Sequence, residues 1–163
     1  MLLVEADVSP EWDSRTDWPQ VASRAARAAV AHSRHAALLE REVEVSVKFT
    51  SDAEVRALNA AWRGKDRATN VLSFPMAGEA ELEAAILLGD IVLAHGVCVA
   101  EAEAMKVPAA SHAAHLVAHG MLHLLGYDHE RGEAQADDME ETERRALAAI
   151  GLPDPYATTE VQP

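Results

Sequence analysis

Three histidines near residue 120 constrain this chain more than any other feature. They occur in the segment HGMLHLLGYDH at residues 119–129. On an α-helix, residues four apart lie on the same face, so the imidazoles of His119 and His123 can point at one ion. Gly126 then allows an unusual turn that can return His129 to the same point. Three neutral imidazoles plus one open position is the arrangement of a catalytic zinc ion, so we predict a single Zn²⁺ bound by these histidines.

One position in this segment decides its chemistry. The metzincin pattern H-E-x-x-H-x-x-G-x-x-H matches the chain at every specified position except the second, where the chain has Gly120. In metalloproteases the glutamate at that position takes the proton from the zinc-bound water. Gly120 cannot take a proton. The sequence therefore predicts a metallohydrolase site of protease shape in which either another group is the base or the substrate is not a peptide.

Two further residues are candidates for the surroundings of the site. His115 lies one helical turn before His119, so it could line the site or hydrogen-bond within it, although a polar core neighbour would have the same spacing. Asp90 interrupts an apolar stretch and could orient a ligand histidine through its second ring nitrogen.

Hydrophobic periodicity places the motif in one mixed domain. Residues 43–49 alternate between apolar and polar, which is the pattern of a half-buried strand, and residues 18–39 have the Ala, Arg and Leu content of one long helix. Further strands are predicted over 2–8, 70–74 and 86–94, and further helices over 52–62, 96–106, 111–125 and 133–150. This order predicts a single α+β domain over residues 1–163 with a mixed sheet of about four strands packed with helices. We expect the core to span residues 2–150 and the C-terminus to fray over 152–163.

Composition limits the compartment. Apolar residues make up 49% of the chain, enough for a core, but no stretch approaches the ~20 continuous apolar residues that cross a membrane. The N-terminus has no basic start, and the single cysteine, Cys98, lies in an apolar stretch and is expected to be a small core residue. We therefore expect a cytoplasmic protein with no membrane partner.

Charge argues against a protein that coats nucleic acid. The formal net charge is −13, whereas such proteins are usually basic because phosphate neutralisation supplies their affinity. An acidic run after the motif predicts a solvated helix face: Glu130, Glu133, Asp137, Asp138, Glu140, Glu141 and Glu143. Four arginines would share one stripe if the first helix continued far enough: Arg24, Arg27, Arg34 and Arg41. With Arg63, Lys65 and Arg67 they would form a local positive wall, although an ordinary exposed helix face has the same pattern.

Two longer motifs carry a resemblance to a known family. HLVAHGMLHLLGYDH at residues 115–129 and NAAWRGKDRATNVLSFP at residues 59–75 closely resemble the signature blocks of the YbeY endoribonucleases, bacterial rRNA maturation factors. Gly89-Asp90-Ile91 is similar to a third block, so the resemblance spans roughly residues 43–150.

The resemblance implies a zincin-like α+β domain, one zinc ion on the three histidines, and single-strand-specific RNA hydrolysis in 16S rRNA 3′-end processing and ribosome quality control. It implies rRNA, the small ribosomal subunit and ribosome-assembly factors as partners, and no DNA. Arg63 matches the arginine that the family places near the metal, where a guanidinium can bind a phosphodiester and stabilise its developing charge. Asn70 departs from the aspartate usual in the family, so we assign it no catalytic role.

Two other functions stay open on the sequence. A zinc-dependent peptidase or amidohydrolase would need a base from elsewhere and would have no need of Arg63 for a neutral peptide bond. A non-catalytic ribosome-assembly module with structural zinc is disfavoured, because structural zinc sites usually include cysteine ligands.

Overall fold

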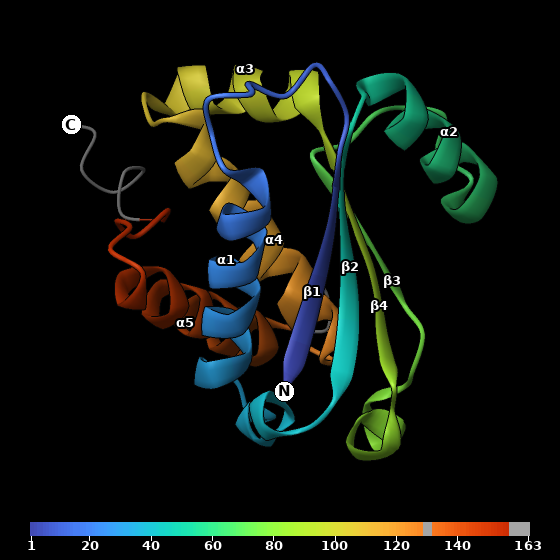
Figure 1. The fold of residues 1–163 in the computed structure, drawn as a ribbon, viewed down its shortest axis with the longest axis vertical. Coiled ribbons are helices and arrows are strands. Elements are labelled where there is room, and N and C mark those ends of the chain that lie inside the picture. The colour runs from blue at the N-terminus through green and yellow to red at the C-terminus, as the bar shows by residue number, and fades with distance from the viewer. Residues whose placement is uncertain (129–131, 157–163) are drawn as a thin grey trace.

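The computed structural model describes residues 1–128 and 132–156. Over these residues the chain forms one four-stranded sheet in the order β1-β2-β4-β3 (Figure 1). The strands are Leu2–Val8 (β1), Val43–Thr50 (β2), Val71–Pro75 (β3) and Leu87–Ala94 (β4). β1, β2 and β4 are parallel, and β3 runs antiparallel beside β4 at the edge. The predicted α+β class and mixed four-stranded sheet are confirmed.

Helices cover the two faces of the sheet unequally. The α-helices over the described residues are Trp18–His32 (α1), Asp52–Arg63 (α2), His95–Met105 (α3), Ala109–Leu124 (α4) and Glu133–Ala149 (α5). Two 3₁₀ turns are Ala36–Glu40 (η1) and Glu79–Ala84 (η2). Figure 1 shows α1, α4 and α5 on one side of the strands and α2 on the other. None of the helices in the described part of the chain combines the length and apolarity needed to cross a membrane.

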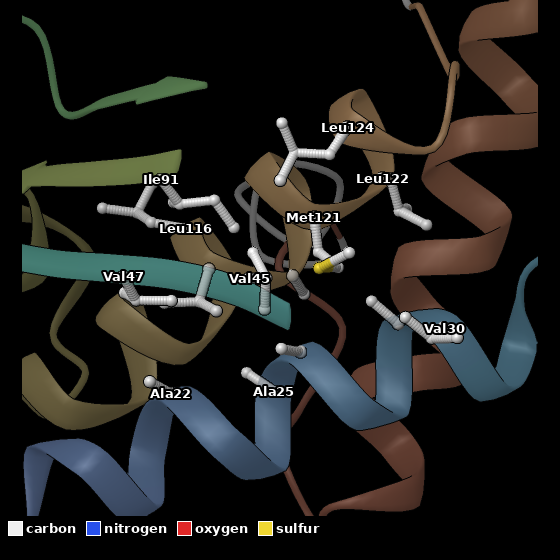
Figure 2. Close-up of a cluster of buried hydrophobic side chains, with 14 of the residues drawn as sticks. Ala22, Ala25, Val30, Val45, Val47, Ile91, Leu116, Met121, Leu122 and Leu124 are labelled. Atoms are coloured by element: carbon white, nitrogen blue, oxygen red, sulfur yellow. The ribbon is translucent and has the colours of Figure 1, made fainter. Parts of the chain in front are cut away.

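The main core lies between the sheet and the layer of α1 and α4. Val45 and Val47 point from β2 toward Ala22 and Ala25 of α1 (Figure 2), and all four side chains are buried. The alternation predicted for residues 43–49 is thus the pattern of β2, whose odd-numbered residues face these helices. Because alanine has a small side chain, α1 can lie close to α4, with which it makes its most extensive packing. This packing fixes α4, which carries two of the predicted metal ligands.

The long helix predicted over 18–39 is wrong in its C-terminal third. α1 ends at His32, because Ser33 is extended and its hydroxyl donates to the Val30 carbonyl (2.7 Å) and accepts from the His35 amide (3.0 Å). A serine side chain that bonds the local backbone competes with the helix in this way. The arginine stripe therefore does not continue beyond α1. All four of its arginines bond to other groups of the protein: Ile150 O for Arg24, Ser23 for Arg27, Glu79 for Arg34 and Leu82 O for Arg41.

The segment after α5 is in contact with that helix over its described part. Gly151 has a positive φ of 81°, and the Leu152 amide then donates to the Leu147 carbonyl at 2.9 Å. The chain turns back, and the Tyr156 hydroxyl donates a hydrogen bond to Glu143 of α5. Of the stretch predicted to fray, residues 152–156 are within the described part and make these contacts, and residues 157–163 lie outside it.

Candidate active site

Helix α4 brings two of the predicted ligands together. His119 and His123 are four residues apart, and their Nε2 atoms lie 3.2 Å from each other. Two nitrogen ligands on one tetrahedral zinc ion, each about 2.05 Å from the metal, lie about 3.3 Å apart. The distance between these two nitrogens thus fits a shared zinc ion. His129, the third predicted ligand, lies outside the described residues.

Glu143 of α5 sets the tautomer of His119. Its Oε1 lies 2.6 Å from His119 Nδ1, and its Oε2 lies 3.1 Å from Nε2 of His115. An ionised carboxylate only accepts hydrogen bonds, so Nδ1 of His119 carries the proton and donates it. Nε2 of His119 is then the nitrogen with the lone pair, and it is the one that faces His123. A carboxylate behind a ligand imidazole is the usual support of protein zinc sites.

The Glu143 side chain is fully buried, with an exposed fraction of 0%. Burial alone would raise the pKa of this carboxyl, but the hydrogen bonds from His115 and His119 outweigh burial and lower its pKa to about 2. A buried carboxylate is tolerated only when its oxygens are paired in this way. Glu143 is therefore ionised over the whole physiological range.

The expectation that Glu143 belongs to a solvated helix face is wrong. Glu143 shares the buried stripe of α5 with Met139, Ala146 and Leu147. Their spacing of three, four and seven or eight residues is that of one helix face. A charged residue on an otherwise apolar stripe is the signal that would have marked Glu143, and it was hidden within a run of acidic neighbours.

The predicted residue His115 lies behind the predicted ligand His119, on the same helix. Its Nε2 shares the Glu143 carboxylate with His119, and its ring is mostly buried, at 17% exposed. His115 thus contacts the same carboxylate as His119, and its predicted place in the surroundings of a metal site stays a prediction.

Asp90 lies on the other face of the sheet. On β4 the side chain of Ile91 points toward Gly120 of α4, and neighbouring strand residues point to opposite faces. Asp90 accordingly lines a separate groove with Trp62 and Lys48. The structure gives the role of histidine partner, proposed for Asp90 from the sequence, to Glu143.

Arg63 shares one cavity with the two histidines. The cavity has a volume of about 590 Å³ and is lined by Arg63, His119 and His123. Arg63 is the last residue of α2, which begins at the Ser51 cap, where the hydroxyl accepts from the Glu54 amide (3.1 Å). Gly64 ends the helix with a φ of 70°. The two caps thus fix the backbone of Arg63 at the border of the cavity that this residue helps to line. Other polar lining residues are Thr69, Asn70, Ser73, Glu79 and Asp128.

Asn70 holds the wall of this cavity in place. Its Nδ2 donates to Glu101 at 3.1 Å, and its Oδ1 accepts from the Val71 amide at 2.7 Å. His112 Nε2 lies 2.7 Å from the same Glu101 carboxylate. The amide of Asn70 is thus engaged on both sides, which suits an anchor at the start of β3 better than a base.

Gly120 allows α4 to lie very close to the sheet. A Cβ at this position would lie 2.9 Å from Ile91 Cγ2 and 2.9 Å from Ser73 Oγ, closer than side chains pack. The Ser73 hydroxyl also donates to the Gly120 carbonyl at 3.2 Å. Close packing therefore requires glycine at residue 120. The absence of the glutamate is also a chemical difference from the metalloproteases.

The fold and the paired imidazoles define a class: α+β proteins that present a histidine pair on a helix packed beneath a mixed sheet. The model of the family described as Endoribonuclease YbeY matches residues 11–151. A relative from Novosphingobium aromaticivorans, named Endoribonuclease YbeY, is 51% identical over 95% of this chain and 96% of its own length. A relative of the same name from Rhizorhabdus wittichii is 50% identical over 98% of this chain and 99% of its own.

The chain belongs to the YbeY endoribonuclease family. The resemblance stated from the sequence and the predicted class of enzyme are thereby confirmed. The solution structure of TM1509 from Thermotoga maritima superposes with a TM-score of 0.60, covering 92% of this chain and 89% of that chain at 23% identity. That likeness supports the fold.

Proposed function

We propose that this protein is a zinc-dependent, single-strand-specific endoribonuclease of rRNA maturation, acting in 16S rRNA 3′-end processing and ribosome quality control. The observation that carries the proposal is the shared cavity of Arg63, His119 and His123. In this proposal the cavity holds the positive charge of Arg63 beside the histidine pair that we propose binds the metal. The names of the relatives, all endoribonucleases, support RNA as the substrate.

Each described residue has a distinct role in this proposal. His119 and His123 hold the metal with His129, and Glu143 keeps His119 in the binding tautomer. A bound zinc ion supplies Lewis-acid chemistry, which polarises a phosphoryl oxygen or lowers the pKa of water toward ~7. The Arg63 guanidinium binds the phosphate through two parallel hydrogen bonds and stabilises the charge that develops on it. A neutral peptide bond would give Arg63 no such role, which favours RNA over a peptidase substrate.

The preference for single strands rests on the family resemblance and not on the shape of the site. The cavity of about 590 Å³ that Arg63, His119 and His123 line is the place where we propose that the RNA strand binds.

The net charge of −13 suggests how the substrate is delivered. An acidic protein gains little from phosphate neutralisation and should bind free RNA weakly. We propose that rRNA is presented on the small ribosomal subunit, so that docking supplies most of the specificity. Tight, salt-insensitive binding to arbitrary RNA would contradict this part of the proposal.

A paired assay tests the function. Wild type, His123→Ala and Arg63→Ala are each incubated with zinc and then given small ribosomal subunits that carry a 16S rRNA precursor and, separately, a generic unfolded protein. Arg145→Ala is the matched control, because Arg145 is an exposed arginine on α5 that forms a surface ion pair with Glu141. We expect RNA cleavage in wild type and the control, and its loss in the other two.

Two outcomes would overturn the proposal. Zinc-dependent cleavage of the protein substrate that does not need Arg63 would make the site a peptidase. If the wild-type protein cleaves neither substrate, and wild type and His123→Ala support ribosome assembly in cells equally well, the non-catalytic module is favoured.

A further inference from the structure

The last described residues of the chain contact Glu143, the carboxylate that hydrogen-bonds to His119. Tyr156, thirteen residues after Glu143, donates its hydroxyl hydrogen to Glu143 Oε2 at 2.6 Å. Two contacts hold the tyrosine there: its amide donates to Asp154 Oδ1 at 2.8 Å, and Asp154 pairs with Arg144 of α5 at 3.2 Å. The segment after the turn at Gly151 is therefore folded against α5 with its aromatic side chain directed inward.

The two oxygens of Glu143 have separate partners. Oε2 accepts from Tyr156 and faces His115, whereas Oε1 faces His119. The His115 ring also packs edge-on against Tyr156, with the ring centroids 5.9 Å apart. With Oε2 held on one side by these two rings, the carboxylate plane is fixed and Oε1 points at His119 Nδ1.

The environment makes each of these contacts matter. Burial and the neighbouring Glu143 carboxylate raise the pKa of Tyr156 well above its usual range, so the hydroxyl keeps its proton and stays a donor. Away from water, a carboxylate that lost a donor would find no replacement without moving. The movement open to Glu143 is rotation of its carboxylate, and this would carry Oε1 away from His119.

We infer that Glu143 and Tyr156 are positioning residues of the metal site, and that the chain after α5 is part of that site. The inference rests on the proposed zinc function. Tyr156 orients Glu143, Glu143 orients the His119 imidazole, and the Nε2 lone pair of His119 is thereby aimed at the ion. The affinity for zinc should then depend on a residue of the C-terminal segment that does not itself bind the metal.

The test measures zinc affinity of the full-length protein by competition with a chromophoric chelator. It compares wild type with Glu143→Gln and Tyr156→Phe. Glu141→Gln is the matched control, since Glu141 lies on the same helix but its side chain is 49% exposed and pairs with arginines. Loss of such a supporting group typically costs about 10–100-fold in metal affinity, so we expect that range for Glu143→Gln and about 3–10-fold for Tyr156→Phe.

A second readout separates positioning from folding. The absorption spectrum of the cobalt-substituted protein reports ligand geometry, and it should change in both variants and be unchanged in Glu141→Gln. Thermal unfolding in the presence of chelator shows whether each variant folds. If Glu143→Gln does not fold, Tyr156→Phe still decides the question, because it removes only one hydroxyl.

The outcomes are distinguishable. Variants that unfold at lower temperature but bind zinc as tightly as wild type would overturn the inference and leave the proposed function intact. Wild-type protein that binds no zinc would overturn the proposed function, and the inference would fall with it. Weaker zinc binding and an altered cobalt spectrum in Tyr156→Phe, with neither change in the control, would support the inference.

Discussion

The ionised carboxylate of Glu143 should make the metal-free protein sensitive to acid in a defined range. Its pKa is about 2 in the folded protein, against 4.5 for an ordinary glutamate. The unfolded chain therefore takes up the proton more readily than the folded chain. The stability that Glu143 contributes is fully present above about pH 4.5 and is lost as the pH falls from there toward 2.

The size of this contribution follows from the two pKa values. Their difference corresponds to about 3 kcal/mol, at about 1.4 kcal/mol for each tenfold change in proton affinity. In Glu143→Gln the amide oxygen still accepts one hydrogen bond, which is worth about 1 kcal/mol. We therefore expect the substitution to lower the free energy of unfolding by about 2 kcal/mol at pH 7.

The assay is urea unfolding of wild type and Glu143→Gln at several pH values between 7 and 3, with a chelator present so that metal binding does not contribute. The difference between the two proteins should be constant down to about pH 5 and should shrink below it. Glu141→Gln serves as control, because its carboxylate is half exposed and its ion pairs are of the surface kind. A difference of 2 kcal/mol that stays the same at pH 3.5, or no difference at pH 7, would refute the reasoning.

Four further results are expected. Arg63→Ala should lower kcat for RNA cleavage by about 10²–10³-fold, because a charge-stabilising donor is removed, and Arg63→Lys should keep part of that rate. Equal rates for the two variants would contradict bidentate phosphate binding. Gly120→Ala should lower the free energy of unfolding by about 1 kcal/mol, because overpacking against Ile91 and Ser73 exceeds the gain in helix propensity. Urea unfolding measures this loss. In a protein that already carries Ile91→Ala, the same Gly120→Ala change should no longer destabilise. Asn70→Asp should destabilise the protein by about 1 kcal/mol at pH 7 and less at pH 4, because a second carboxylate would face Glu101; thermal unfolding at both pH values checks the sign. Zinc removal by a chelator should abolish RNA cleavage while the circular dichroism spectrum of the helices is retained, and loss of that spectrum would show that the metal is needed for folding.

Local pattern was enough to predict most of the fold. The alternation over 43–49 marks β2, and Ser51 and Gly64 mark the ends of α2, because each of these signals acts within a few residues. The C-terminal end of α1 is also set by a local signal, but helix propensity alone predicts a longer helix. The hydrogen bonds of Ser33 outweigh the helix propensity of the alanines that follow it.

The site was predictable only in part. The spacing of His119 and His123 fixes their convergence on one helix, so it could be read from the sequence. Arg63 and Glu143 come from helices on different sides of the sheet. Tertiary packing, which no local spacing encodes, brings Arg63 to the cavity that the histidines line and Glu143 to His119. Arg63 was found through family resemblance. Glu143 went unnoticed because its charge matched that of its neighbours, while its burial depends on the docking of α5.

The close approach of α4 to the sheet at Gly120 also bears on how such a site could change over evolutionary time. A single codon change from glycine to glutamate would supply the base that the metalloprotease pattern requires at this position. Here that change would first push α4 away from Ile91 and Ser73, and would displace the neighbouring His119, a predicted metal ligand, along with it. Smaller residues at positions 73 and 91 would have to be established before the glutamate could be accepted. A change toward the metalloprotease pattern at this position therefore depends on residues of the strands as well as on residue 120.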